Sequence, residues 1–168
     1  MQRALFIGRF QPFHNAHLRD IRKILKEANE VLIAVGSSQE SNTLENPFSY
    51  EERKQMITKV LKSNKINKFR IFPVPDLFDD EKWAKYIIEK LPTIDVVYSG
   101  NPWTLKCFKK YNKKVKRIRL EKGISSTIVR KMMAKDENWQ KLVPEDVTKF
   151  MSKIAGVVRI KNITQTPL

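Results

Sequence analysis

Two short, continuously apolar runs near the start of the chain flank one amphipathic segment, and this pattern constrains the fold more than any other. The runs RALFIG at 3–8 and EVLIAVG at 30–36 are typical of strands buried on both faces of a sheet. Between them, apolar residues recur at helical spacing and predict a helix over 16–28 with one apolar face. Two strands joined by such a helix pair in parallel through a right-handed crossover.

Three later runs extend the predicted sheet. They are FRIFPV at 69–74, DVVYSG at 95–100 and the weaker VKRIRL at 115–120. Apolar periodicity and capping residues predict helices over 50–62 and 82–91, from 101 or 102, from 125 or 126, and over about 145–155. The alternation predicts a doubly wound, mostly parallel, five-stranded Rossmann-like α/β sheet with helices on both faces. Gly156 is interpreted as the end of the last helix, which leaves 157–168 as a C-terminal tail.

The chain is strongly basic, with 33 Lys and Arg against 18 Asp and Glu and a net charge of +15. Such a charge attracts polyanions, so nucleic acid, nucleotides and other phosphate esters are candidate partners, beside a lysine-rich surface with no partner at all. Much of the lysine is scattered among Asn and Ile, as in LKSNKINKFR. Taken alone, the charge is therefore best explained by a solvated lysine-rich surface, and next by nucleotide binding. The scatter does not favour nucleic acid.

Composition also bears on the compartment. The sequence has no apolar stretch of about eighteen residues that could cross a bilayer. The start, MQRALFIGRF, lacks the apolar region and cleavage site of a signal peptide. Cys107 is the only cysteine, so it cannot form an intramolecular disulfide and is expected to be a small core residue. We therefore expect a soluble, cytoplasmic protein with no membrane partner.

Both histidines of the chain lie in GRFQPFHNAH at 8–17, where the first strand gives way to the first helix. His14 and His17 are three residues apart, so they point to the same side of the emerging helix. A helix N-terminus offers unpaired amides and a positive dipole end, and imidazoles placed there complete a site for a phosphate chain. Arg9 adds a planar fork of donors for the same anion.

Three other roles for the histidine pair remain open from the residues alone. Zinc would need two further ligands, and the chain has no third histidine and only one cysteine. A core position conflicts only in part with the apolar stripe, which begins at Leu18 and continues through Ile21. A histidine could also act as a nucleophile that carries a covalent nucleotidyl group.

Two motifs now identify a resemblance. GRFQPFHNAH resembles the HxGH-type first motif of the nucleotidyltransferase superfamily, and ISSTIVR at 124–130 resembles its second motif, ISSTxxR. The lead-in GRFQPFH is similar to archaeal-type nicotinamide mononucleotide adenylyltransferases, as are the segments 36–53, 98–102 and 139–147. The likeness spans almost the whole chain, and it implies a nucleotidyltransferase domain over 1–156 followed by the tail over 157–168.

The resemblance implies adenylyl transfer from ATP to nicotinamide mononucleotide, which forms NAD and releases pyrophosphate. The attacking phosphate is already an anion, so catalysis needs positioning and charge neutralisation rather than a general base. Magnesium is implied as an ion bound through the ATP phosphates, without a metal site made by the protein. Assembly into a homo-oligomer is implied as well.

The resemblance also implies a set of site residues. The catalytic residues are His14, His17 and Arg130. The ATP-binding residues are Gly8, Arg9, Phe10, His14, His17, Gly100, Asn101, Ser125, Ser126, Thr127 and Arg130. The mononucleotide-binding residues are Gly36, Ser37, Ser38, Asp80 and Trp83. Purely structural roles compete for several of them: a helix cap for the serines of 125–126, a tight turn for 36–38 and a buried aromatic for Trp83.

Two positions depart from the family pattern. Asp80 stands where the archaeal enzymes carry asparagine, and its carboxylate would repel a nicotinate group, which predicts a preference for the amide substrate. Ala16 stands where the first motif usually has glycine, which adds a methyl group at a close backbone approach. Two alternative functions remain: the same chemistry on another phosphorylated acceptor, and a nucleotide- or nucleic-acid-binding module without turnover.

Overall fold

The structure is a computed structural model that describes residues 2–77 and 79–165. The chain divides into two compact units. The first consists of residues 2–8, Asp20–Ser38 and Lys68–Leu120. The second consists of Arg9–Arg19, Gln39–Asn67 and the residues from Glu121 onward. Each unit is described by itself below.

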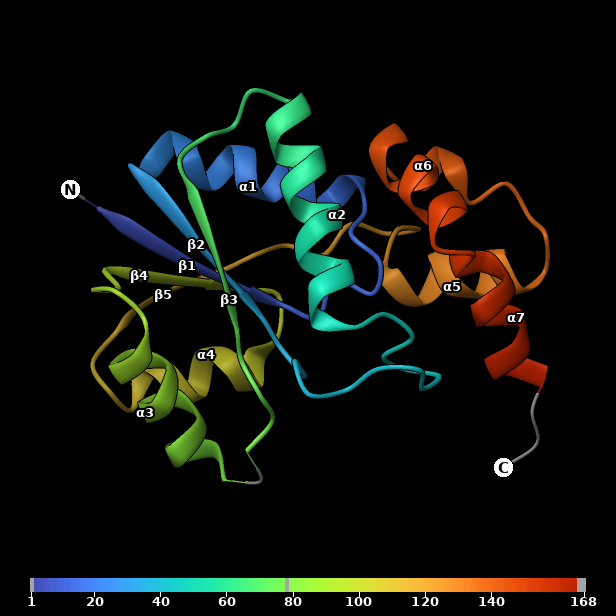
Figure 1. The fold of residues 1–168 in the computed structure, drawn as a ribbon. Coiled ribbons are helices and arrows are strands. Elements are labelled where there is room, and N and C mark those ends of the chain that lie inside the picture. The colour runs from blue at the N-terminus through green and yellow to red at the C-terminus, as the bar shows by residue number, and fades with distance from the viewer. Residues whose placement is uncertain (1, 78, 166–168) are drawn as a thin grey trace. The chain divides into compact units, whose positions relative to one another are not determined.

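The first unit contains one parallel sheet of five strands in the order β3-β2-β1-β4-β5 (Figure 1). The strands are β1 (Arg3–Gly8), β2 (Glu30–Val35), β3 (Phe69–Pro73), β4 (Val96–Ser99) and β5 (Lys114–Arg117). All five predicted strands are confirmed. The strand order reverses between β1 and β4, and in open α/β sheets the crevice beyond the carboxyl ends of two such strands is where ligands bind.

Alternate residues of the strands face opposite sides of this sheet, and both sides are buried. Leu5 lies in register between Leu32 and Val97, and these side chains pack with residues of α3 (Asp80–Lys90) and α4 (Pro102–Lys109). The part of α1 (Asn15–Glu27) from Asp20 onward covers the other face (Figure 1). The doubly wound fold with helices on both faces is therefore confirmed.

Local capping explains where the helices of the first unit begin. Asn101 caps α4 by accepting from the amide of Trp103 at 3.0 Å, with Pro102 at the first helical position, as predicted. Asp79 caps α3, so this helix begins two residues before the predicted start at 82. Cys107 is buried in the core under α4, where burial and the charge of Asp80 raise the pKa of its thiol.

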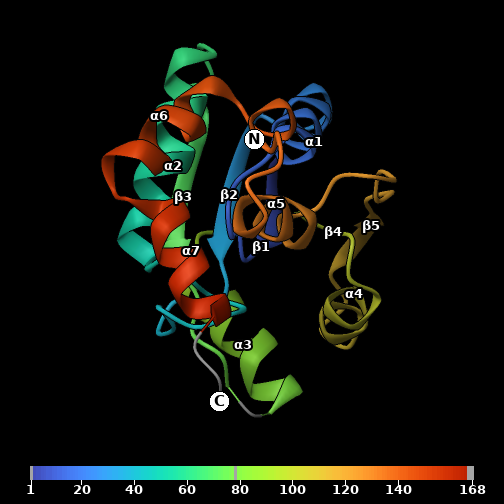
Figure 2. The ribbon, with the colours of Figure 1, turned by 90° about the vertical axis from the view of Figure 1, so that its right-hand side faces the viewer.

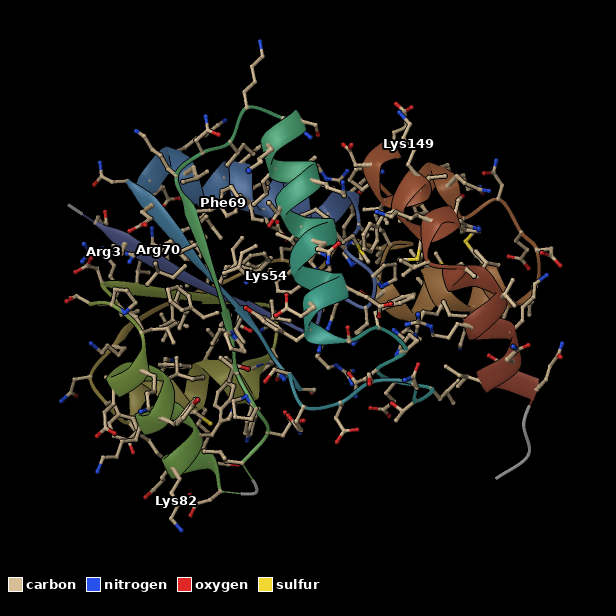
Figure 3. The ribbon with its side chains drawn as sticks, in the orientation of Figure 1. Arg3, Lys54, Phe69, Arg70, Lys82 and Lys149 are labelled. Carbon is tan, nitrogen blue, oxygen red and sulfur yellow. The ribbon has the colours of Figure 1, made fainter. Side chains whose placement is uncertain are left out.

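Some of the positive charge is used in ion pairs at the amino ends of the strands. Glu30 at the start of β2 accepts from Arg70 of β3 at 2.7 and 2.9 Å and from Arg3 of β1 at 3.1 Å (Figure 3). Hydrogen bonds from Arg70 and Arg3 lower the pKa of Glu30. These arginines therefore link β1, β2 and β3 at the amino ends of the strands.

The second unit is helical. It contains the first turn of α1 together with α2 (Tyr50–Ser63), α5 (Ser126–Ala134), the 3-10 turn η1 (Gln140–Leu142), α6 (Glu145–Lys153) and α7 (Gly156–Gln165). Figure 2 shows α7 between α5 and α6, and α6 beside α2. The predicted capping box at the start of α2 is present, formed by Ser49 and Glu52. Over the described part of the chain, no helix is long and apolar enough to span a membrane.

Helix α7 differs from the expected tail over 157–168. Ala155, with a φ of 52°, adopts the left-handed conformation just after α6, and Gly156 then begins a new helix. Ile160 is buried within the unit, and Arg159 forms an ion pair with Glu52. The helix is therefore packed tertiary structure, and only residues 166–168 of the expected tail lie outside the described residues.

Candidate active site

His14 and His17 cap the start of α1 reciprocally. The amide of His14 donates to Nδ1 of His17 at 3.1 Å, and the amide of His17 donates to Nδ1 of His14 at 3.4 Å. This is the geometry of a capping box, with imidazole nitrogens in the place of the usual oxygens. Because Nδ1 of each ring is an acceptor, each neutral ring carries its proton on Nε2 and presents that N–H as a donor.

The two imidazole rings stack, with centroids 3.5 Å apart and an angle of 13° between their planes. Burial, aided by the charge of Arg19, lowers the pKa of His14 from 6.5 to about 4. Burial and the neighbouring His14 also lower the pKa of His17 well below its usual value. Both rings are therefore neutral near pH 7, which removes the like-charge repulsion that would otherwise oppose this stacking.

Two phenylalanines support the histidine pair from one side. The ring of Phe10 meets that of His17 edge-on at 4.8 Å, and the ring of Phe13 lies 5.3 Å from it. Both phenylalanines are buried, whereas His17 is only half-buried. Phe10 has a φ of 52°, so the loop turns through a left-handed residue to place this ring. Packing against these two phenylalanine rings restricts the orientation of the His17 ring.

Residues of α2 and the segment before it hold the loop between β1 and α1. The buried side chain of Gln11 pairs with the main chain of Phe48 twice, at 2.8 and 2.9 Å. Arg53 is fully buried and donates Nη1 to the carbonyl of Arg9 at 2.9 Å and Nε to that of Ser49 at 3.2 Å. Sequence reasoning missed Arg53, because a basic residue in a helix is usually solvated.

The second motif contacts the same loop. Ser125 caps α5 by accepting from the amide of Ile128 at 3.2 Å, which is the structural role that the sequence left open. Ser126 Oγ donates to the carbonyl of Pro12 at 2.9 Å, and Arg130 Nη1 donates to the carbonyl of Gln11 at 2.8 Å. The two motifs, more than a hundred residues apart in sequence, are thus joined through one loop of the second unit.

A cavity of about 540 Å³ lies in the second unit beside these residues. Its lining includes Arg9, Glu45, Thr127, Arg130, Lys131 and Lys135, so four cationic side chains share it with one carboxylate. Burial and the nearby charge of Arg9 lower the pKa of Arg130. Most of the wall surface is apolar and comes from residues such as Leu44, Pro47, Ile160 and Ile163. A cavity with this charge balance suits a polyanion such as a phosphate chain.

Arg9 lies against Glu45 at the cavity, with Nη1 2.9 Å from Oε2. The side chains are 47% and 74% exposed, so solvent screens this pair and its contribution to stability is small. A polyphosphate could therefore replace the carboxylate as the partner of Arg9 at little cost.

Most of the other residues that are predicted to bind nucleotide lie at the carboxyl ends of strands in the first unit. Gly8 ends β1, and its carbonyl accepts from the amide of Gly36 at 3.0 Å, while Ser38 donates its amide to Val74 at 3.1 Å. Gly36, Ser37 and Ser38 thus form the turn after β2, with Ser37 in the left-handed region at a φ of 47°. Gly100 and Asn101 follow β4, and a Cβ on Gly100 would lie 2.6 Å from a side-chain carbon of Leu120.

The expected acceptor residues Asp80 and Trp83 lie together in the first unit with a third residue, Trp103. Trp83 is 5% exposed and belongs to the core, as in the buried alternative considered from the sequence. Trp103 is 40% exposed, its ring centroid lies 5.0 Å from that of Trp83, and its Nε1 donates to Asp80 at 2.8 Å. The exposed indole is thus Trp103, which sequence reasoning missed although it directly follows the cap of α4.

Comparison with known proteins agrees with the motifs. Residues 5–132 match the cytidylyltransferase-like family. The nicotinamide-nucleotide adenylyltransferase of Thermococcus kodakarensis is 36% identical over 165 residues, which cover 96% of this chain and 88% of that protein. The protein of the same name from Saccharolobus solfataricus is 39% identical over 171 residues, 99% of each chain.

Solved structures show the same fold. The chain superposes on a bifunctional NMN adenylyltransferase/ADP ribose pyrophosphatase from Francisella tularensis, complexed with AMP and a Mn ion, with a TM-score of 0.75 and 26% identity. The match covers 96% of this chain but only 52% of that one, so the chain spans about half the length of this bifunctional protein. The chain belongs to the cytidylyltransferase-like family and, within it, to the group of the nicotinamide-nucleotide adenylyltransferases.

Proposed function

We propose that the protein transfers the adenylyl group of ATP to nicotinamide mononucleotide, forming NAD and pyrophosphate. Its relatives are named for this activity. The single observation that carries the proposal is the junction of the two motifs, in which the capped histidine pair and Arg130 meet on the loop between β1 and α1. This junction collects hydrogen-bond donors at a helix N-terminus, as binding of a phosphate chain requires.

In this proposal His14 and His17 bind ATP phosphate through their Nε2–H groups. These bonds strengthen as negative charge grows on the departing pyrophosphate, so they stabilise the transition state more than bound ATP. Arg9 and Arg130 bind the β and γ phosphates in the cavity, and the amides of Ser126 and Thr127 at the start of α5 add further donors. Phe10 contributes by holding the ring of His17.

The reaction itself is one displacement at phosphorus. An oxygen of the mononucleotide phosphate forms a bond to the α-phosphorus while the bond to the bridging oxygen breaks, and its electron pair leaves with pyrophosphate. The tautomers of the histidines support this over a covalent nucleotidyl-histidine. Each Nδ1 accepts an amide hydrogen and each Nε2 carries a proton, so neither neutral ring has a free lone pair for attack or for zinc.

The residues of the first unit complete the proposal as nucleotide contacts. We assign Gly8, Gly100 and Asn101 to ATP, because they lie where β1 and β4 end. We assign Gly36, Ser37, Ser38, Asp80 and Trp83 to the mononucleotide, with Trp103 as the exposed ring beside Asp80. Asp80 would favour the nicotinamide over the nicotinate form, since a carboxylate repels a carboxylate.

A divalent ion, Mg²⁺ in this proposal, would be held by ATP phosphates and water. In residues 2–77 and 79–165 no group of three His, Cys, Asp or Glu side chains could hold a metal ion. Glu45 is the carboxylate of the cavity, and it could approach an ion carried in on the triphosphate. Bound there, the ion would screen the phosphate charge and polarise the α-phosphorus. Chelation should therefore abolish turnover, and Mg²⁺ or Mn²⁺ should restore it.

We further propose that the nucleotidyltransferase domain extends beyond residue 156 to include α7, because Ile160 and Ile163 line its cavity, and that the protein acts as a cytoplasmic homo-oligomer. The test of the whole proposal is incubation with ATP, Mg²⁺ and a panel of phosphorylated acceptors, followed by the mass of the products. NAD from nicotinamide mononucleotide is the expected product. A different dinucleotide would identify another acceptor. No pyrophosphate with any acceptor, together with salt-sensitive binding of nucleic acid, would identify a non-catalytic module and refute the proposal.

A further inference from the structure

The side chain of Arg159 joins helix α7 to the first turn of α2 and to the segment in front of α2. Its two terminal nitrogens lie 2.7 and 2.8 Å from the two carboxylate oxygens of Glu52, a bidentate ion pair. Nη1 also donates to the carbonyl of Pro47 at 3.1 Å, and the guanidinium lies over the ring of Phe48. The side chains of Arg159 and Glu52 are 26% and 20% exposed, so solvent screens this pair far less than the surface pairs.

Glu52, the partner of Arg159, is itself part of the structure that holds the loop between β1 and α1. Glu52 Oε2 accepts the amide of Ser49 at 2.9 Å in the capping box of α2. The next residue, Arg53, donates to the carbonyls of Ser49 and Arg9. Phe48 pairs with Gln11, whose own carbonyl accepts from Arg130. Hydrogen bonds connected by the main chain of 47–53 therefore lead from Arg159 to the carbonyl of Arg9 and, through Gln11, to Arg130.

Helix α7 also forms a wall of the cavity of about 540 Å³ in the second unit. Ile160 and Ile163 of α7 line the cavity together with Arg9 and Arg130. Pro47, the carbonyl partner of Arg159, lines it as well. A displacement of α7 relative to Glu52 would therefore change the cavity wall and the position of the guanidinium groups together.

We propose that Arg159 is a positioning residue for ATP. It fixes the segment 47–53 in the place from which Phe48 and Arg53 hold the loop between β1 and α1, and so keeps Arg9 and Arg130 arranged for the phosphate chain before ATP arrives. Small displacements of groups that bind a reacting phosphate reduce affinity and rate strongly, because the arrangement is then no longer provided in advance. The inference rests on the proposed function for the identity of the ligand, and on the hydrogen bonds for the role of Arg159.

The chain offers a matched control on the same helix. Lys161 of α7 forms an ion pair with Asp136 at 2.6 Å, and the two side chains are 31% and 73% exposed. This pair also attaches α7 to its neighbours, but its partner Asp136 follows α5 and lies outside the segment 47–53. Removal of Lys161 therefore tests whether any loss of an α7 ion pair has the same effect.

The experiment compares Arg159→Met with Lys161→Met. ATP binding is measured by calorimetry with Mg²⁺ and no acceptor, and NAD formation is measured over a range of each substrate. For Arg159→Met we expect ATP affinity to fall about tenfold and the KM for ATP to rise by a similar factor, with the KM for the mononucleotide changed less than about twofold. Arg159→Lys should recover about half of the loss on a logarithmic scale, since an ammonium makes one contact where the guanidinium makes two. Lys161→Met should stay within about twofold throughout.

Glu52→Gln provides a second route if Arg159→Met does not fold. The amide oxygen of glutamine can still accept from Ser49, so the capping box is kept while the ion pair is lost. Glu52→Gln alone should weaken ATP binding in the same direction. Where Arg159→Met does fold, its addition to Glu52→Gln should weaken ATP binding little further. Unchanged ATP affinity in either variant, or equal losses in the Arg159 and Lys161 variants, would overturn the inference. If the unmodified protein binds ATP but forms no NAD, the proposed function fails, and the calorimetry still decides the role of Arg159.

Discussion

The amides of His14 and His17 each donate to the ring nitrogen of the other residue, and this exchange fixes both the start of α1 and the tautomers of the rings. A capping interaction ordinarily serves only the helix. Here it also places the ring proton of each histidine on Nε2, in rings that stay neutral because burial lowers the pKa of both. Capping therefore uses Nδ1 of each imidazole, whereas the proposed phosphate binding uses Nε2 of the same rings.

Replacement of His17 should separate these two uses. His17→Ala should lower turnover on the order of 10² to 10³-fold through the lost donor, and lower the free energy of unfolding by about 1 kcal/mol through the lost cap. His17→Gln should recover the stability, since glutamine suits this capping position, but not the turnover. Steady-state kinetics and urea unfolding measure the two quantities. Parallel losses of both in the two variants would make the role of His17 purely structural.

The pKa of His14 makes stability depend on pH. The pKa is about 4 in the folded protein and 6.5 ordinarily, so between these values the unfolded chain binds more protons. The contribution of His14 is thus complete above about pH 6.5 and is lost as the pH falls toward 4, with a total of about 3 kcal/mol. Urea unfolding at several pH values measures this. His14→Asn, which can still cap the helix, should show a flatter profile over the same range.

Arg130 should matter for ATP through its geometry as well as its charge. Arg130→Lys keeps the charge but cannot both donate to the carbonyl of Gln11 and present a second donor in the same plane. We expect kcat/KM for ATP to fall on the order of 10²-fold, because a charge-assisted contact to phosphate is lost. Lys149, paired with Glu145 on the exposed face of α6 (Figure 3), gives the control, and Lys149→Ala should leave kinetics unchanged. Full activity of Arg130→Lys would exclude a bidentate role.

Asp80 should control which pyridine nucleotide is accepted. Its carboxylate is held by the indole N–H of Trp103, so it stays in place as a fixed negative charge. Asp80→Asn removes the charge, and the ratio of kcat/KM for nicotinamide over nicotinate mononucleotide should fall by about a factor of 5 or more. Trp103→Phe keeps an aromatic ring but releases Asp80, and should reduce the same ratio less. If this kcat/KM ratio is equal in the unmodified protein and both variants, Asp80 does not determine which pyridine nucleotide is accepted.

The fold was predicted from local sequence patterns. Elements encoded by neighbouring residues were therefore predicted, and elements that depend on distant contacts were not. Continuous apolar strands and the cap at Asn101 are encoded by neighbouring residues, so the sheet and the start of α4 were predicted. Helix α7 was missed because Gly156 suggested a stop, whereas the left-handed residue is Ala155. The stability of this helix comes from Arg159 and Ile160, whose partners are distant in sequence.

The site was predicted in the same partial way. The spacing of the histidines indicated one helix face and a phosphate site, but not that the rings cap the helix for each other. Arg53 could not be recognised, because its burial depends on the carbonyls of Arg9 and Ser49, which only the folded chain brings within reach. Trp83 was predicted to contact the mononucleotide and Trp103 was missed, because the sequence does not distinguish the exposed ring from the buried one.

The buried position of Cys107 has a practical consequence. It is the only thiol of the chain, it is 3% exposed, and its raised pKa keeps it protonated and unreactive. A cysteine introduced at an exposed residue would therefore be the sole target of a maleimide dye. Leu44, which is 62% exposed and lines the cavity of the second unit, is such a position, and fluorescence from a dye there would test in real time whether nucleotide enters this cavity, without a background label.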